Sequence, residues 1–278
     1  MKFESQSFYS QAQTLLLQEL GLTDWKPKHQ LSYTKTFSDT QTAGRFDAEY
    51  FQPKYEDIIA KIKAYGGGWD VLGNLVTLKK CIEPGSEAYE EFGVPFVRVS
   101  NLSKFGLSDN NQQFLSEKTY KELLDHQPKQ GEILLSKDAT PGIAYYLGSV
   151  TEKMVPSGGI LRLKVKKENL LPEYLTLVLN SEIVQKQIEK AAGGSIINHW
   201  RPDQVETTVI PILKFELQQE ISKLVHESFD CRAKSKSLLT LAKTGVEKAI
   251  ETSEDEAMAW MEGELVGLGI ELAGVGHE

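Results

Sequence analysis

Apolar residues at helical spacing occupy a short segment near the start of the chain. They recur every three or four positions and comprise Phe8, Ala12, Leu15, Leu16 and Leu20. Gly21 follows directly, as a glycine at a helix C-terminus does. We therefore predict a helix over residues 5–20. A polar and aromatic connector follows it, with a second short helix near residues 54–64 and a Gly-Gly-Gly stop at 66–68.

A much longer helical pattern lies near the other end of the chain. Residues 216–250 contain no proline and a single late glycine, Gly245. Apolar side chains repeat there at heptad spacing, with Ser228 and Ser235 filling two gaps, at Leu217, Ile221, Leu224, Cys231, Leu238 and Ala242. This predicts a coiled-coil-type helix of roughly 50 Å. Such a helix cannot bury its seam alone, so it needs the N-terminal helix, a second copy of the chain or another protein.

Between these helices the pattern changes to short apolar runs separated by turn residues. Six of them predict strands, at residues 75–78, 95–99, 133–135, 143–147, 159–165 and 208–212. Helices are predicted at 116–124 and 172–192. Because strands and helices do not alternate regularly, we expect an α+β (mixed α/β) fold. The chain is thus divided into residues 1–65 (helix and connector), 66–213 (mixed domain), 214–262 (long helix) and 263–278 (an acidic flexible tail).

The net charge of −8 is concentrated at the C-terminus. Residues 251–278 contain eight acidic residues and no lysine or arginine, so residues 1–250 sum to zero. The acidic total therefore does not exclude a nucleic-acid partner, although no basic stripe argues for one. The sequence has no apolar run of about 20 residues and no signal-peptide pattern. Cys81 and Cys231 form no CxxC pair, and we expect a cytoplasmic protein without a membrane partner.

Motifs for catalysis or metal binding are missing from the sequence. It contains no GxxxxGK[ST], HExxH or GxSxG motif, and its five histidines lack metal-ligand spacing. Asp203 follows Pro202, but the Glu-x-Lys of a nuclease does not follow on the next strand. The Ser136-Lys137-Asp138 segment at a strand end fits an ordinary polar loop, a ligand-reading loop or, least well, a catalytic site. We expect no catalytic residue, metal or cofactor in this chain.

The order of several motifs resembles the target-recognition domain of type I restriction-modification specificity subunits. The motifs run from GNLVTL (73–78) and VPFVRVSNL (94–102) through GEILLSKDATPG (131–142), LPEYL (171–175), LNS (179–181), GGS (193–195) and VIPI (209–212) to QQEI (218–221). With AMAW (257–260) they cover roughly residues 70–262. Two positions depart from the family pattern. Glu132 replaces the usual Asp, and Ala139 stands where Gly is frequent.

This resemblance implies a non-catalytic subunit that reads double-stranded DNA. Family members usually have two recognition domains separated by two long helices, whereas this sequence has one domain and one long helix. It is similar to a half-subunit, so we expect a homodimer whose inverted half-sites are separated by a fixed spacer. The resemblance also implies methyltransferase subunits, which bind S-adenosylmethionine and methylate adenine, and possible helicase-nuclease subunits.

The loops supply side chains of the kinds that read bases and phosphates. One group is Arg98, Asn101, Lys104 and Gln112; a second is Lys137 and Thr140; a third is Asn198, His199 and Arg201. Ser157 and Gly158 could let the backbone approach a phosphate. Each of these residues, taken singly, also fits an ordinary polar side chain of a surface loop. Two other functions stay open: a reader for another phage-defence methyltransferase, and a hydrolase or nuclease built on residues 136–138 or Asp203.

Overall fold

The computed structural model describes residues 2–150, 152–192 and 199–269. Contacts within the chain divide it into two units. One is a helical unit made of Met1–Gln11 and Lys223–Glu278, and the other is a recognition unit made of Ala12–Ser222. The helices α1 (Lys2–Glu19) and α9 (Phe215–Glu251) each contribute to both.

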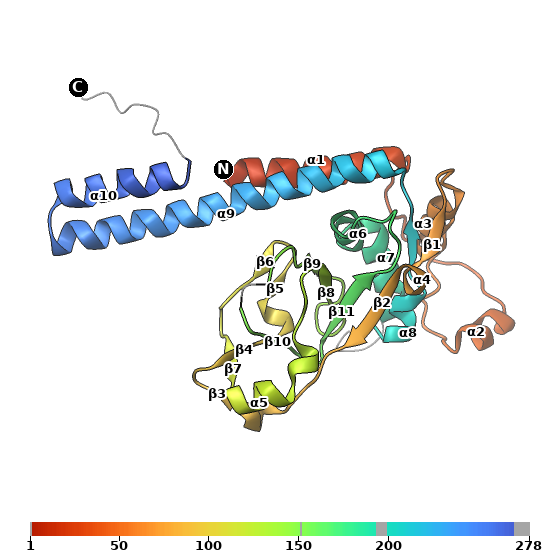
Figure 1. Cartoon of the computed structure of the whole chain (residues 1–278). Helices are drawn as coiled ribbons and strands as arrows, with labels where there is room; N and C mark the ends of the chain where they lie inside the picture. The colour runs from red at the N-terminus through yellow and green to blue at the C-terminus, as the bar shows by residue number, and fades with distance from the viewer. Residues whose placement is uncertain (1, 151, 193–198, 270–278) are drawn as a thin grey trace. The chain divides into compact units, whose positions relative to one another are not determined.

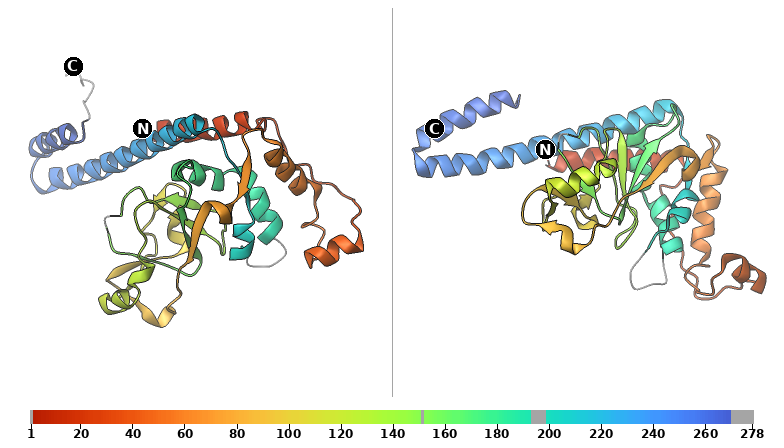
Figure 2. Two further views of the ribbon diagram at one scale, coloured as in Figure 1. Left: turned by 45° about the vertical axis from the view of Figure 1, so that its right-hand side comes forward. Right: turned by 60° about the horizontal axis from the view of Figure 1, so that its bottom comes forward.

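In the helical unit, the first turns of α1 lie against α9, and α10 (Glu254–Gly267) doubles back along the end of α9 (Figures 1 and 2). The Ser228 hydroxyl donates to the Ser5 carbonyl at 2.7 Å, and both residues are buried. Close packing of α10 depends on Gly245, where a Cβ would lie 2.2 Å from the sulfur of Met261. The Ser253 hydroxyl caps α10 by accepting from the Glu256 N–H.

The predicted helix at 216–250 is confirmed by α9, but its heptad seam is only partly buried. Ile221 and Ser228 are buried, and so is Val225, which the heptad assignment left out. Ala242 is exposed, and the remaining predicted positions are half-buried, namely Leu217, Leu224, Cys231 and Leu238. The contact with α1 is made through a small residue, Ser228, which is buried against Ser5. The half-buried row therefore flanks the internal contact and keeps part of its apolar surface.

The predicted start of the acidic tail, residue 263, lies within a helix. The helix α10 continues to Gly267, whereas a flexible tail was predicted from residue 263 onwards. Trp260, Glu264 and Leu268 line one pocket with Leu241 and other residues of α9, so the face that packs on α9 extends past residue 261. Burial of Leu265 adds a further reason for the helix to continue through Gly263.

The recognition unit has a mixed α+β architecture, which confirms the predicted fold class. Its central antiparallel sheet has the order β2-β11-β8-β9, with strands Val76–Lys80, Ile160–Val165, Glu132–Ser136 and Ala144–Tyr146. A second sheet, β10-β4-β7-β3, contains Val155–Pro156, Val94–Val97, Gln113–Leu115 and Tyr89–Glu90. Two further pairs are β1-β12 (Trp69–Val71, Val209–Pro211) and β5-β6 (Leu102–Ser103, Gly106–Leu107).

Helices and turns surround these sheets. They are α2 (Phe37–Ala43), α3 (Pro53–Ala64), α4 (Leu72–Leu75), α5 (Glu117–Glu122), α6 (Pro172–Leu179), α7 (Glu182–Ala192), α8 (Pro202–Glu206), η1 (Ser86–Ala88), η2 (Val99–Asn101) and η3 (Leu124–His126). The strand β8 is buried along its whole length because β11 and β9 flank it and α6 packs against it. Its register, Ile133↔Leu163 and Leu135↔Leu161, fixes where the loop after Ser136 begins.

The single helix predicted at 172–192 is two helices, α6 and α7. Asn180, between them, accepts from the Ala144 N–H at 3.0 Å and donates to the Ala144 carbonyl at 2.8 Å. Its side-chain amide thereby pairs with the outer edge of β9 as a neighbouring strand would. The Ser181 carbonyl then accepts from the N–H groups of Val184 and Gln185 and starts α7. This break depends on a partner 36 residues away, so helical periodicity alone does not reveal it.

Candidate nucleic-acid interface

Two of the predicted recognition loops meet at Gly159. A Cβ at this position would lie 2.9 Å from Cγ2 of Val99 and 3.6 Å from Cβ of Asp138. The Gly159 carbonyl also accepts from the Lys137 N–H at 2.9 Å. The absence of a side chain at Gly159 therefore lets the η2 turn and the loop after β8 approach one another. Sequence reasoning chose these loops separately, and the fold places them together.

The third group joins this site through Asp138. Its carboxylate binds the Lys137 ammonium and accepts from Nδ1 of His199 at 2.8 Å. The backbone of Lys137 accepts from the Trp200 N–H at 2.8 Å, and Trp200 is buried. Burial alone would raise the pKa of Asp138, but hydrogen bonds and attraction from Lys137 and His199 hold it below its usual value. A carboxylate thus fixes two cationic or proton-donating side chains at one place.

Several predicted contact residues remain accessible at this site. Thr140 is exposed, and its backbone carbonyl accepts from the Ser136 hydroxyl at 2.6 Å. The preceding residue, Ala139, has φ +60°, a conformation that glycine adopts at lower cost. His199 and Arg201 are also exposed, and Arg201 pairs with Asp203 at 2.9 Å. Asn198 lies outside the described residues.

The stretch from residue 98 to 113 contributes fewer readers than predicted. Asn101 is only 1% exposed, and its amide donates to the carbonyls of Ser108 and Asn110 while its oxygen accepts from the Arg98 N–H. This residue is a turn scaffold, so the prediction that it reads a base is wrong. The half-buried Gln112 likewise donates to the carbonyls of Phe96 and Gln113 and braces the β4-β7 pair.

Arg98 and Lys104 are the two residues of this stretch that remain candidates for contacting DNA. The Arg98 guanidinium donates to the Asn111 carbonyl from a half-buried position. Lys104 lies 5.1 Å from the ring centroid of Phe105 on the β5-β6 hairpin, and burial lowers the pKa of its ammonium. Both cations are therefore partly desolvated before any ligand arrives, which strengthens their electrostatic interaction with an anion.

Ser157 and Gly158 do not form the predicted phosphate cradle. Ser157 is buried, and its N–H donates to the Val97 carbonyl at 2.8 Å. A Cβ on Gly158 would lie 3.3 Å from the Cβ of Glu83, so this glycine faces another part of the protein. A glycine is favoured at position 158 because the segment around Glu83 passes close to it, whereas the prediction assumed an approaching phosphate.

The catalytic alternatives find little support in the geometry. Ser136 is fully buried; its hydroxyl donates to the Thr140 carbonyl and accepts from the Ile143 N–H, so it is a loop brace. Asp203 is paired with Arg201 on the surface. Across the described ranges, no group of three His, Cys, Asp or Glu side chains is placed to hold a metal ion. None of the helices described is long and apolar enough to cross a membrane.

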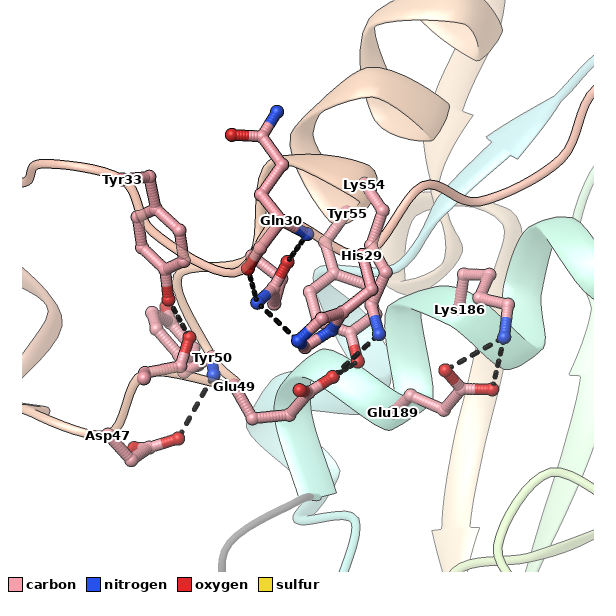
Figure 3. Close-up of polar contacts among 12 residues, drawn as sticks. His29, Gln30, Tyr33, Asp47, Glu49, Tyr50, Lys54, Tyr55, Lys186 and Glu189 are labelled. Carbon is pink, nitrogen blue, oxygen red and sulfur yellow. Dashed lines mark hydrogen bonds and ion pairs between the residues drawn. The ribbon is translucent and has the colours of Figure 1, made fainter.

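The connector lines part of a pocket next to the loop after β8, and the sequence analysis did not predict this. Glu49 and Tyr55 line a pocket of about 390 Å³ together with Thr140, Gln185 and Glu189. Figure 3 shows this connector cluster beside α7, with Lys54 and Tyr55 directed towards Glu49. The buried Gln52 holds the connector by accepting from the Gln30 N–H and donating to the Gln30 carbonyl, both at 3.0 Å. Local sequence patterns carry no signal for such long-range pairing.

Gly159 provides a direct test of the convergence of these loops. We predict that Gly159→Ala costs about 1–3 kcal/mol of stability, because its Cβ meets the stiff Val99 side chain. Moving the η2 turn away from the loop after β8 should also weaken DNA binding by the folded protein. Denaturation and DNA titration would measure the two effects, and Gly66→Ala, where a Cβ meets nothing within 4 Å, is the control. If Gly159→Ala and Gly66→Ala have the same stability and the same affinity for DNA, the two loops do not meet at Gly159 as described.

A mixed domain with converging polar loops, followed by a long helix, defines a recognition module. Residues 69–238 match the family described as type I restriction modification DNA specificity domain, which covers more than half of the sequence. The chain therefore belongs to this family. A comparison with curated protein sequences gave no match.

Solved structures give distant matches. The HsdS subunit from Thermoanaerobacter tengcongensis is 15% identical, with a TM-score of 0.41 over 83% of this chain and 51% of that one. The type I S subunit from M. genitalium is 12% identical, with a TM-score of 0.44 over 98% and 59%. The type IIG restriction endonuclease BpuSI is 11% identical, with a TM-score of 0.45 over 62% and 28%. The chain thus spans about half to three-fifths of the two S subunits.

Proposed function

We propose that this chain reads one half of a bipartite duplex DNA target within a restriction-modification complex. Membership of the specificity family supports this function. The single structural observation that carries it is the convergence of three loops: the η2 turn and the loop after β8 meet at Gly159, and the segment around His199 binds the loop after β8 through Asp138. Reading a base pair requires several donors and acceptors held in one arrangement, which such a junction of loops provides.

Within this site the accessible side chains divide into two roles. Arg201 and Thr140 lie on exposed loops and are our candidates for base edges, where Arg pairs with guanine and Thr contacts either an edge or a thymine methyl group. Lys137, His199, Arg98 and Lys104 are candidates for the phosphate backbone. Asp138 holds Lys137 and His199 in place, so the ammonium and imidazole need little reordering when DNA binds.

We further propose that this chain acts as a homodimer. The half-buried apolar row on α9 offers a surface on which a helix of a second copy could pack. A twofold axis between the copies would give two inverted half-sites at a constant separation. Methyltransferase subunits would dock on the same helices, bind S-adenosylmethionine and methylate a flipped adenine. Helicase-nuclease subunits would join for cleavage. These reactions would take place in the partners, and we assign none of them to this chain.

The proposal predicts DNA binding without turnover. The purified chain should bind a duplex of its target sequence with an affinity that falls steeply with salt, by a log–log slope of about −0.9 per phosphate contacted. A randomised duplex pool would identify the target, and a titration at several salt concentrations would give the slope. Transfer of methyl groups from S-adenosylmethionine or cleavage of DNA by the chain alone would instead favour the hydrolase or nuclease alternative.

The remaining alternative is a reader for another phage-defence methyltransferase. It would bind DNA in the same way and differ only in its partners. Co-purification of the full chain from its native host would separate the two possibilities. A methyltransferase accompanied by a helicase-nuclease would support the type I complex, whereas a methyltransferase with other subunits would support the alternative.

A further inference from the structure

The connector segment 45–50 lies outside the residues that match the family and makes contacts that reach the recognition site. We propose that Arg45 is a specificity-determining positioning residue, which holds Arg201 in the orientation needed to read DNA. This inference rests on the proposed function. A chain of hydrogen bonds links the connector to Arg201.

The first link is the carbonyl of Ala191, in the last turn of α7. It accepts two hydrogen bonds, one from Nη1 of Arg45 at 3.1 Å and one from Nε2 of Gln204 at 3.2 Å. Ala191 and Gln204 lie on either side of residues 193–198 in the sequence. A single acceptor therefore ties together the end of α7, the start of α8 and the connector.

The second link runs from Gln204 to Arg201. The Gln204 side-chain oxygen accepts from the Arg201 N–H at 3.0 Å, while its nitrogen donates to Ala191. Both ends of this amide are thus used, and rotating it would break both bonds. The position of the Arg201 backbone is therefore coupled to Ala191, and through Ala191 to Arg45.

Arg45 is itself held rigidly, which makes it effective as an anchor. Its Nε donates to Asp47 at 2.7 Å, and the other oxygen of Asp47 accepts from the Tyr50 N–H at 3.0 Å. The guanidinium lies 4.6 Å from the centroid of the Tyr50 ring, and the ammonium of Lys190, in α7, lies 5.0 Å from the same ring. The contact of Lys190 with the Tyr50 ring therefore joins α7 to the connector.

A guanidinium suits this position because it donates in several directions at once. Nε donates to Asp47, Nη1 donates to Ala191, and the charged group lies over the ring of Tyr50. Lysine would keep the charge and lose the forked donors, while methionine would keep an unbranched apolar stem and lose both the charge and the donors. We therefore expect Arg45→Met to have a larger effect than Arg45→Lys, and both to act on discrimination more than on non-specific binding.

The test uses the full chain and duplexes selected from a randomised pool. Affinity is measured for the selected duplex and for one of scrambled sequence. Arg45→Met should lower the ratio of the two affinities by about tenfold, within the range that losing one base contact produces. The matched control is Lys35→Met, which removes another connector cation, paired with the exposed Glu56 at 2.8 Å. This control should leave the ratio unchanged.

Hydrogen exchange of residues 199–207 provides a readout that does not depend on DNA. Arg45→Met should accelerate exchange there by several fold, whereas Lys35→Met should not. Unchanged exchange, or a stability loss without a change in discrimination, would overturn the role of Arg45. A wild-type chain that fails to discriminate any duplex would instead overturn the proposed function, and the exchange measurement would still test the link from Arg45 to Arg201.

Discussion

Arg162→Met is expected to lower the free energy of unfolding of the recognition unit by about 3–5 kcal/mol, the range for removing one partner of a buried ion pair. Arg162 and Glu132 are 2% and 4% exposed, and they sit on the adjacent strands β11 and β8. The guanidinium donates to both carboxylate oxygens, from Nε at 2.8 Å and from Nη2 at 3.1 Å. Without Arg162, the Glu132 charge would remain buried and uncompensated.

The same pair connects the sheet to a neighbouring turn. The third donor of Arg162, Nη1, binds the Asp125 carbonyl in η3 at 2.8 Å, and Glu132 accepts from the Lys129 N–H at 3.0 Å. Losing the guanidinium therefore also releases the segment that leads into β8. Because β8 carries the loop with Lys137 and Thr140, we expect weaker DNA binding as well as lower stability.

Glu132 should make stability depend on pH at the acidic end. Burial alone would raise its pKa, but hydrogen bonds from Arg162 and Lys129 and the nearby charges hold the pKa below its usual value. A carboxyl whose folded pKa is depressed stabilises the fold at pH values above its unfolded pKa of about 4.3 and loses this contribution as the pH falls further. In Glu132→Gln this part of the acid dependence should be absent.

Urea denaturation at several pH values would measure these effects. The control is Arg201→Met, which removes an arginine from the exposed pair with Asp203 and should cost less than about 1 kcal/mol. A double change, Arg162→Met with Glu132→Leu, should recover much of the stability because no charge is left buried. Equal losses in Arg162→Met and Arg201→Met would show that the buried pair contributes no more than a surface contact.

Much of the fold follows from local patterns. The strands at 133–135 and 159–165 and the long helix were predictable because short apolar runs and heptad apolar repeats indicate burial within one element. The observed elements differ at their ends and where a distant group intervenes, as Asn180 does by pairing with the edge of β9. The very short strands β3, β5 and β6 carry too few residues to show any period.

The candidate site was predictable as a set of loops and less so as a set of side chains. Polarity in a loop does not reveal whether a side chain faces solvent or the chain itself. Arg201 is exposed, whereas Asn101 uses its whole amide to brace a turn. Arg45 could not be found in this way, because its partner Ala191 lies 146 residues further along the sequence. Only the folded chain brings the two together.

Replacing Leu224 and Leu238 together by Asp should convert the expected homodimer into monomers. Both residues belong to the half-buried row on α9, beside the internal contact formed by Val225 and Ser228. A carboxylate forced into an interface without a partner costs at least about 1–3 kcal/mol, and a twofold dimer contains each substitution twice. We therefore expect the dimer Kd to rise at least about a hundredfold.

Sedimentation at micromolar concentration would measure this change, with circular dichroism to verify that α9 stays helical. Leu239→Asp is the matched control, because Leu239 is 59% exposed and lies outside the predicted seam. A wild-type monomer, alone or with the methyltransferase, would contradict the homodimer proposal. If the double variant stays dimeric and folded, the copies must associate through another surface. The spacing between half-sites would then not be set by α9.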